Sequence, residues 1–425
     1  MSVRPRSVDG EQPLLGREPQ QLPGDDSGEI GARLVGLELV RVSVPLREEW
    51  ASAAGTFSQR DSLLVRAVLS APSPGGGLQE SEGWGECGAL PDPTYSSEYT
   101  AAAAEVACNY LVPALLRAGV ASAEAVGPAL WGTKGHQMAK AAFEAALLDA
   151  QLRAGGQRMA DFLAAKSKLG EPASASVVAG VAVGLAEHVG TVLEEVERHI
   201  AAGYHRVKLK ITPEHDVEVL SAVRDRWPEL VLFADANGSY RHLGFADVVA
   251  LLSRLDGLGL TCLEQPLGES DLVGHARLAR WLGTPICLDE TLTSLDTVAT
   301  ALELGACSVV NIKASRLGGY LAAVEAHDLC ASRDVPVWCG GMVETGIARA
   351  ANVALAALPR FSLPGDLSAT GRYFEADLAS PLPLRSDGTI AVPDGPGTGV
   401  EVDNAAVSNL CTWRRWWPAR YGASR

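Results

Sequence analysis

Five ionisable residues recur at nearly equal intervals along the second half of this chain, and each ends a short apolar run. They are separated by 25, 29, 25 and 24 residues: Lys210, Asp235, Glu264, Asp289 and Lys313. Short apolar runs divided by helix-length segments predict buried parallel strands with crossover helices. In a barrel of eight such units the carboxyl ends of the strands meet on one face, where catalytic groups are found. The pattern therefore predicts a (β/α)-barrel whose five charges share one pocket.

Length and charge limit the classes of ligand. At 425 residues the chain has room for a barrel of about 250 residues and a second domain. No stretch reaches the roughly 18 uncharged apolar residues that a transmembrane helix needs. A net charge of −15 argues against nucleic acid and anionic membranes, because both require a basic face. We therefore expect a small-molecule substrate, no nucleic acid and no membrane partner, in a homo-oligomer of unspecified size.

The cysteines indicate a reducing compartment. The chain has eight of them without a Cys-x-x-Cys spacing, and Cys262, Cys287, Cys307 and Cys339 lie inside apolar runs. Together with the absence of a signal-peptide pattern, this predicts reduced core cysteines in a cytoplasmic protein. The histidines show no metal-ligand pairing, which argues against zinc.

The rest of the chain is expected to form an α+β domain that caps the barrel. Apolar residues alternate from Val40 to Leu46, and helical spacing covers 97–117 and 136–154. The first barrel strand is expected within 177–185. The expected divisions are a disordered tail (1–31), the capping domain (32–157), a modified TIM barrel (158–366), a C-terminal return to the capping domain (367–412) and a second tail (413–425).

Two lysines share one face of a predicted strand. Apolar residues alternate with Lys208 and Lys210, so both ammonium groups lie opposite the apolar face. At roughly 6.6 Å and an effective dielectric near 20, the two charges repel by about 2.5 kcal/mol. This repulsion would lower the pKa of one lysine toward that of a general base. Considered alone, the pair fits a solvated edge strand equally well.

Three carboxylates at the ends of successive strands would repel one another unless a cation lies among them. Asp235, Glu264 and Asp289 offer hard oxygen ligands on a rigid frame, which favours Mg²⁺ and also admits Mn²⁺. Such a metal can hold a substrate carboxylate and absorb the enediolate charge formed when the neighbouring carbon loses its proton. Lys210 and Lys313 lie four units apart and would approach that carbon from opposite sides. The set predicts proton abstraction α to a carboxylate.

Alternative interpretations remain open at this point. Asn237 and Gln265 are either hydrogen-bond partners of the metal ligands or turn residues. A Schiff-base aldolase would also use a lysine on a barrel strand, but it leaves the three carboxylates unexplained. A catalytically inactive barrel serving as a scaffold would be favoured by the loss of any of the five charges, and none is lost.

The five charges lie in short motifs, which occur in this order: Lys208-x-Lys210, Asp235-Ala236-Asn237, Glu264-Gln265-Pro266, Leu288-Asp289-Glu290 and Asn311-Ile312-Lys313-x-Ser315-Arg316-Leu317-Gly318-Gly319. In sequence and order these motifs resemble those of the enolase superfamily, in its muconate lactonizing subgroup. Further segments resemble the family that o-succinylbenzoate synthases share with N-succinylamino acid racemases, over about residues 34–403. These are Gly83–Cys87, Tyr95–Tyr99, Met138–Ala142, Gly341–Ile347 and Leu363–Asp366.

The resemblance implies a role for each site residue. The three carboxylates bind Mg²⁺, Lys210 is the α-proton base and Lys313 is its opposite partner. Lys208, in the same motif as Lys210, is expected to be a third catalytic lysine. In the synthase reaction Lys210 acts as base and acid while Lys313 stabilises the enediolate as a cation. In the racemase reaction the two lysines exchange the proton between faces. Arg316 either orients or tunes Lys313, or it forms a salt bridge at the surface or behind the site.

Other matched positions concern the substrate. Gly341, Met342 and Glu344 are expected at or beside the substrate. Residues 53–56 read Ala-Ala-Gly-Thr where family members often have Ser-Phe-Gly-Thr, so an aromatic substrate contact is either missing or supplied by Trp50 or Phe57. Ala182 replaces a common serine. These departures leave the core chemistry intact and concern recognition of the succinyl group or side chain.

Overall fold

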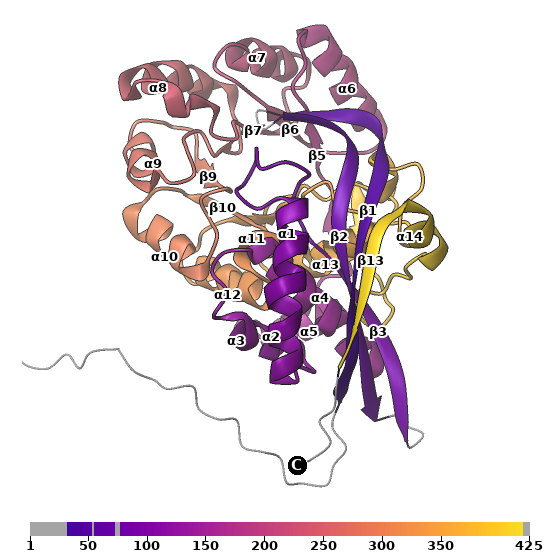
Figure 1. The fold of residues 1–425 in the computed structure, drawn as a ribbon. Coiled ribbons are helices and arrows are strands. Elements are labelled where there is room, and N and C mark those ends of the chain that lie inside the picture. Colours follow the sequence, from indigo (N-terminus) through magenta and orange to yellow (C-terminus); the bar gives the residue numbers. More distant parts are fainter. Residues whose placement is uncertain (1–31, 53–54, 73–76, 420–425) are drawn as a thin grey trace, which may run out of the picture. The chain divides into compact units, whose positions relative to one another are not determined.

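A four-stranded antiparallel sheet forms the first layer of the chain. The computed structural model describes residues 32–52, 55–72 and 77–419, so the expected tail over 1–31 and the substituted Ala53–Ala54 lie outside the described residues. Residues from Ala32 onward form one unit. The sheet order is β13-β1-β2-β3, and its long strands are seen in Figure 1. Their bounds are β1 (Arg33–Ser52), β2 (Gly55–Pro72), β3 (Leu78–Glu86) and β13 (Cys411–Pro418).

Helices cover one side of this sheet, and those at 100–118 and 137–154 fall where helical spacing predicts them, whereas the short helical segments over 123–130 were not predicted. Two glycines of β3, Gly83 and Gly85, let the longest of these helices approach the sheet closely, since a Cβ at Gly85 would overlap the Ala142 carbonyl. The helices are α1 (Thr100–Val106), a π-helical turn (Ala107–Leu111), α2 (Val112–Ala118), a 3₁₀ turn (Ala123–Ala125), α3 (Val126–Leu130) and α4 (Gln137–Ala154).

No single helix in the described part of the chain is long and apolar enough to cross a membrane. One bent pair, Thr100–Ala118 with Ala123–Leu130, meets the length and composition criterion only when both helices are taken together. The apolar residues of this pair, among them Ala103, Leu111 and Leu115, are buried in the core of the capping region.

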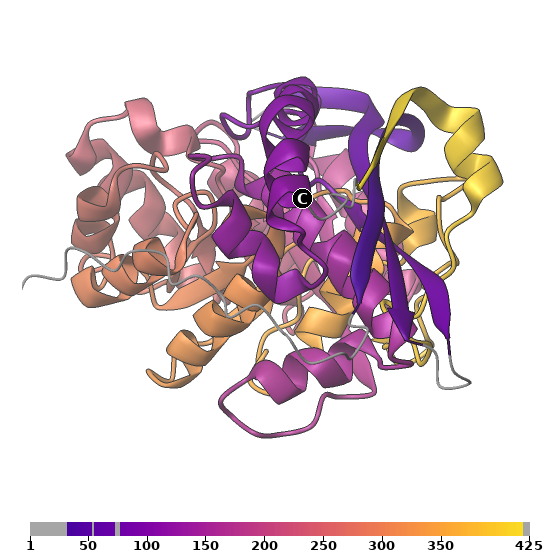
Figure 2. The ribbon, with the colours of Figure 1, turned by 60° about the horizontal axis from the view of Figure 1, so that its bottom comes forward.

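The expected tail from residue 413 was wrong for its first six residues. They belong to β13, which pairs antiparallel with β1 from Gly36 opposite Pro418 to Val42 opposite Cys411. The three tryptophans of this segment favour a strand, and Arg414 pairs with Glu38 across it at 3.3 Å. The preceding helix α14 (Asn404–Leu410) contacts β1, and Figure 2 shows it in yellow beside the long strands.

A parallel sheet of seven strands forms the barrel in the part of the chain that the structure describes. The strand order, β11-β10-β9-β8-β7-β6-β5, follows the chain, as expected for repeated βα units. The strands are β5 (Val181–Val183), β6 (Arg206–Lys210), β7 (Val231–Asp235), β8 (Leu263–Glu264), β9 (Ile286–Leu288), β10 (Val309–Ile312) and β11 (Val337–Cys339).

Helices surround these strands, as Figure 1 shows for α6 to α10 and α12. Their ends carry local signals: Ser294 and Thr297 form a capping box before α10, and Gly305 ends that helix with a left-handed φ of 64°. The helices are α5 (Met159–Lys166), α6 (Val189–Ala201), α7 (Asp216–Arg226), α8 (Phe245–Leu252), α9 (Leu272–Leu278), α10 (Leu295–Leu304), α11 (Ala314–Leu317), α12 (Tyr320–Ala331) and α13 (Gly346–Ala356). Short 3₁₀ turns cover Ser239–His242, Ser253–Leu258 and Thr370–Arg372.

The expected eighth unit is replaced by an irregular segment. Leu363 and Asp366 donate backbone hydrogen bonds to the carbonyls of Val337 and Cys339 on β11. On the other side, a Cβ at Gly180, just before β5, would overlap the carbonyl of Gly365. Residues 363–366 therefore lie in the gap between the first and last strands. Pro364 and Gly365 disfavour a regular strand there, which explains why the expected eighth strand does not form.

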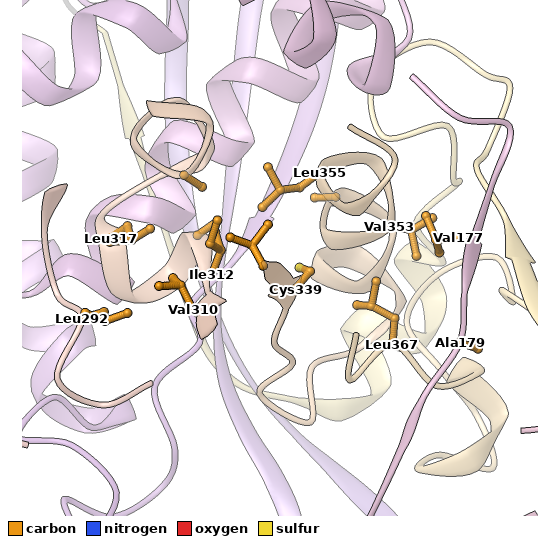
Figure 3. Close-up of a cluster of buried hydrophobic side chains, with 14 of the residues drawn as sticks. Val177, Ala179, Leu292, Val310, Ile312, Leu317, Cys339, Val353, Leu355 and Leu367 are labelled. Atoms are coloured by element: carbon orange, nitrogen blue, oxygen red, sulfur yellow. The ribbon is translucent and has the colours of Figure 1, made fainter. Parts of the chain in front are cut away.

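The stretch expected to hold the first barrel strand is divided between two sheets. Its first part is β4 (Ser176–Val178), which pairs antiparallel with β12 (Thr389–Ala391), and its second part is β5. The larger core lies between strands and helices, where Figure 3 shows Ile312 and Cys339 beside Leu355 of α13. A smaller buried cluster consists of Phe233, Cys262, Cys287, Val309 and Trp338.

Candidate active site

The structure brings the five predicted charges together at the carboxyl ends of consecutive strands. Lys210, Asp235 and Glu264 are the last residues of β6, β7 and β8, while Asp289 and Lys313 directly follow β9 and β10. The register places Lys210 beside Asp235 and Asp235 beside Glu264. Side-chain exposure is 10% for Lys210 and 6% for Lys313, and lower for the carboxylates.

Lys208 lies among three carboxylates beneath this face. Its ammonium group is 2.9 Å from Asp235, 2.7 Å from Glu264 and 2.6 Å from Asp366. Burial opposes the charged form, but the three carboxylates outweigh it and raise the pKa of Lys208 well above its ordinary value. The expectation that repulsion from Lys210 lowers a lysine pKa is therefore wrong for Lys208, because its nearest charges are negative.

Lys210 is held by residues at the carboxyl end of β7. Its ammonium group donates to Asp235 Oδ2 at 2.7 Å and to Asn237 Oδ1 at 2.6 Å. The backbone N–H of Asn237 donates to Asp235 Oδ1 at 3.0 Å, and Asn237 has a positive φ of 43°. Asn237 is therefore both a turn residue and a hydrogen-bond partner of the site.

Gln265 also combines the two roles left open by the sequence. It has a positive φ of 40°, and its side-chain oxygen accepts hydrogen bonds from the backbone N–H groups of Asp289 and Thr291, at 3.1 and 3.3 Å. Its amide nitrogen donates to the hydroxyl of Thr291 at 2.8 Å. Gln265 thus fixes the backbone that presents Asp289.

The three carboxylates have different electrostatic environments. Burial raises the pKa of Asp235 and Asp289, but neighbouring cations outweigh it and lower the pKa of both groups. Those cations are Lys208 and Lys210 for Asp235, and Lys313 and Arg316 for Asp289. The pKa of Glu264 lies well above its usual range because of burial and the charge of Asp235.

Lys313 is held partly by a residue that sequence reasoning missed. Its ammonium group donates to Asp289 Oδ2 at 2.7 Å and to the Tyr95 hydroxyl at 2.9 Å, and Met342 Sδ lies 3.6 Å away. The Tyr95 hydroxyl donates to Asp289 Oδ2 at 2.8 Å. Burial, followed by the charges of Asp289 and Glu290, raises the pKa of Tyr95 well above its ordinary value, which keeps the hydroxyl protonated. Membership of the Tyr95–Tyr99 motif was the only signal for it.

Arg316 is a buried neighbour of this lysine rather than a surface residue. Its Nη2 donates to the Glu290 carbonyl, its Nε lies 3.9 Å from Asp289 Oδ1, and its guanidinium is 5.4 Å from the centre of the Tyr95 ring. Arg316 therefore adds positive charge beside Asp289. Among the described residues, no hydrogen bond joins it to Lys313.

The loop after β11 forms another wall of the site. Glu344 accepts a hydrogen bond from the Met342 backbone N–H, and its carboxylate lies 3.1 Å from Arg349. At Gly341 a Cβ would come within 2.8 Å of the Asp366 carbonyl, so a side chain would be crowded. Val343 has a positive φ of 55°, a costly conformation for a β-branched residue. Glu344 thus holds a strained loop against the pocket.

These walls line a pocket that contains both lysines of the site. Trp50 and Phe57 both line it, so either can supply the aromatic contact expected there, and Ala182 lines it as well. The ring of Trp50 meets that of Tyr373 edge-on at 5.9 Å. The lining also includes Ser52, Leu90, Tyr95, Lys208, Lys210, Asn237, Lys313, Gly341, Met342, Val343, Arg349 and Asp366.

The carboxylates suit a hard divalent cation by their chemistry, although they are turned toward lysines. Within the described ranges no three acidic, histidine or cysteine side chains converge closely enough to form a ready metal cage. Asp289 Oδ1 is nevertheless buried and accepts no hydrogen bond from the described residues. A cation here would take Asp235, Glu264 and Asp289 as oxygen ligands in place of some of their lysine contacts.

Comparisons with known proteins agree with this geometry. Residues 191–406 match the family model described as enolase C-terminal domain-like. An N-succinylamino acid racemase from Amycolatopsis is 47% identical over 90% of this chain and 99% of its own. An o-succinylbenzoate synthase from Geobacillus stearothermophilus is 38% identical over 87% of this chain and 93% of its own.

A solved structure gives the same result for the fold. An enolase superfamily member from Listeria innocua superposes with a TM-score of 0.82 at 32% identity, covering 92% of this chain and all of that one. The match includes the capping region as well as the barrel, since nearly the whole described chain is covered. This chain therefore belongs to the enolase superfamily, in the family of o-succinylbenzoate synthases and N-succinylamino acid racemases.

Proposed function

We propose that this chain is an o-succinylbenzoate synthase, which dehydrates 2-succinyl-6-hydroxy-2,4-cyclohexadiene-1-carboxylate in menaquinone biosynthesis. The observation that carries the proposal is the position of Lys210 and Lys313, which line one pocket from strands four apart with three carboxylates between them. Removal of the proton α to a carboxylate needs such a base, with positive charge for the resulting enediolate.

The two lysines divide the work in this proposal. Lys210 takes the α proton, the C–O bond to the ring hydroxyl breaks, and Lys210 returns the proton to the departing hydroxyl as water. Lys313 remains an ammonium group and stabilises the enediolate charge from the other side. Lys208 contributes a fixed positive charge below the site, balanced by Asp366.

The three carboxylates and a divalent cation complete the proposed site. Enolase-superfamily sites combine a lysine or histidine base with one or two Mg²⁺ ions. We assign Asp235, Glu264 and Asp289 as the Mg²⁺ ligands, with Mn²⁺ as a substitute. When bound, the cation would neutralise the substrate carboxylate and the charge that develops on it. Gly341 and Met342 shape the substrate wall, and Glu344 holds that wall in place.

A second activity, racemisation of N-succinylamino acids, is supported by a specific observation. The Amycolatopsis relative at 47% identity carries that name, and a base on each face of one carbon is what a racemase needs. Lys210 and Lys313 would then remove and return the proton from opposite faces. Both activities begin with the same proton removal, so one site can host both.

One experiment tests the main activity. Purified protein with Mg²⁺ is mixed with the cyclohexadiene substrate, and formation of the aromatic product is followed by absorbance. Turnover that is lost in Lys210→Ala supports the proposal, whereas an inactive wild-type protein overturns it. Borohydride treatment with a carbonyl substrate separates the aldolase alternative, because only a Schiff base would leave a covalently modified lysine.

The proposal includes the cellular compartment and the oligomeric state of the enzyme. All eight cysteines are free thiols, which agrees with a reducing cytoplasm. We propose that the enzyme acts there on small carboxylates as a homo-oligomer. Sedimentation of the purified protein measures its assembly, and a purely monomeric species would contradict that part.

A further inference from the structure

A buried glutamate outside the five charges is connected to Lys210 through one side chain. Glu290 follows Asp289 just after the end of β9, and only 6% of its surface is exposed. Its Oε1 accepts a hydrogen bond from Asn237 Nδ2 at 2.7 Å, and Asn237 Oδ1 accepts one from Lys210 Nζ at 2.6 Å. The three residues form a chain of side-chain hydrogen bonds that ends at the proposed base.

The chemistry of the asparagine amide gives this chain a direction. An amide has an accepting end and a donating end, whereas an ammonium group can only donate. If the amide of Asn237 turned by 180°, its NH₂ group would face the Lys210 ammonium group, and the hydrogen bond would become a donor–donor contact. An acceptor at the far end, supplied by Glu290, selects the orientation that Lys210 needs.

The surroundings leave this selection to Glu290. The backbone of Asn237 is already fixed by its N–H bond to Asp235, so the freedom that remains is the rotation of its side chain. The second oxygen of Glu290 is buried and accepts no hydrogen bond from the described residues. The main-chain carbonyl of Glu290 accepts a hydrogen bond from Arg316, which anchors the backbone of this residue.

We infer that Glu290 is a positioning residue for Lys210, acting through the amide of Asn237. The inference rests on the proposed function, since it assigns a task within that proton transfer. Misplacing a base by about 1 Å can cost on the order of 100-fold in rate. Loss of the acceptor should therefore slow proton transfer by Lys210 and leave proton transfer by Lys313 unchanged.

Two substitutions separate the acceptor from the shape of the side chain. Glu290→Met keeps the length and removes both oxygens, while Glu290→Gln keeps an oxygen that can accept from Asn237. The readout is exchange of the α proton into deuterated water, measured with each enantiomer of an N-succinylamino acid and the Mg²⁺-loaded enzyme. The enantiomer whose exchange is lost in Lys210→Ala reports on Lys210, and the other reports on Lys313.

We expect Glu290→Met to slow exchange about 10- to 100-fold for the Lys210 enantiomer, with less than about 2-fold change for the other. Glu290→Gln should exchange both at nearly wild-type rates. A matched control is Glu303→Met on the outer surface of α10, whose side chain is 68% exposed and pairs with Arg333. It should change neither rate.

A second variant keeps the test decisive if Glu290→Met folds poorly. Asn237→Ala should produce the same one-sided loss, and the Asn237→Ala/Glu290→Ala double variant, which removes the acceptor as well, should be no slower than Asn237→Ala alone, because the two residues act in series. Equal loss for both enantiomers, or equal rates in the Met and Gln variants, would overturn the role of Glu290. A wild-type enzyme that exchanges neither enantiomer would instead overturn the proposed function, and this role with it.

Discussion

The two lysines of the site are held in place by different parts of the chain. Lys210 is held by Asp235 and Asn237, which are 25 and 27 residues away on the next βα unit. Lys313 is held by Asp289 and also by Tyr95, which is 218 residues away in the capping region. One face of the pocket is therefore complete within the barrel, while the other depends on how the cap docks. The predictions below test whether the two faces also respond independently.

Removal of divalent metal should abolish the activity of both faces together. The three carboxylates lie between the lysines, and the substrate carboxylate carries charge that only a cation among them can neutralise. Exhaustive chelation should reduce dehydration and the exchange of both enantiomers to background, and added Mg²⁺ should restore them. Undiminished turnover after chelation would contradict the assignment of Asp235, Glu264 and Asp289 as metal ligands.

Replacing each lysine should separate the faces. Lys210→Ala should reduce dehydration by at least about 10³-fold, because it removes base and acid together. Lys313→Arg keeps a positive charge without an efficient proton donor, so it should impair racemisation far more than dehydration. The measurement compares both activities in each variant with the wild type. A Lys313→Arg enzyme that racemises at the normal rate would refute the two-lysine assignment.

Tyr95→Phe should weaken only the face that depends on the cap. The substitution removes the hydroxyl that accepts from Lys313 and donates to Asp289, while the ring and its packing remain. We expect α-proton exchange to fall about 10-fold for the substrate enantiomer that reports on Lys313. The free energy of unfolding should fall by about 1 kcal/mol, which is typical of one hydrogen bond. Equal slowing of both enantiomers would show that the faces are coupled through Asp289.

The smallest effect on activity is expected at a second contact between the cap and the Lys313 side. Glu144 of α4 accepts a hydrogen bond from the Leu321 backbone N–H at the start of α12, at 3.0 Å. Burial raises the pKa of Glu144 to about 7, with the backbone N–H groups of Leu321 and Tyr320 opposing the shift. The folded state thus holds this proton more tightly than the unfolded state, so its contribution to stability is lost as pH rises toward 7.

Glu144→Gln lacks this titration. Its free energy of unfolding relative to wild type should therefore rise between about pH 4.5 and pH 7, by about 3 kcal/mol at most. Urea unfolding of both proteins across this range gives the difference, and activity should change less than about 2-fold. A difference that is constant with pH would show that Glu144 is already ionised in the folded protein.

The same contrast between near and distant partners explains what the sequence could predict. Lys210, Asp235 and Glu264 end strands at a regular period, and that period determines where parallel strands place them. Tyr95 ends no periodic element, and Asp366 lies in the irregular segment that replaces an eighth strand, so neither position followed from periodicity. Both reach the site through packing between parts of the chain that are distant in sequence.

Local patterns failed where the physical signal was ambiguous. The segment from Trp413 to Trp417 alternates poorly because two arginines interrupt its tryptophans, and its partner strand is more than 370 residues earlier. The pKa of Lys208 depends on carboxylates from three other elements, which a two-lysine argument omits. Glu290 was visible in the Leu-Asp-Glu motif, but its task depends on the side chain of Asn237 on another strand.

The positive φ of Val343 has a consequence for how this family can change over time. A β-branched residue in that conformation costs about 1 to 3 kcal/mol, and glycine would remove most of that cost. A mutation to glycine would also remove a buried side chain and raise the entropy of the unfolded chain, so the relief of strain would bring no net gain in stability. Selection for thermal tolerance alone would therefore leave the strained valine in place, and the loop would stay fixed against the pocket.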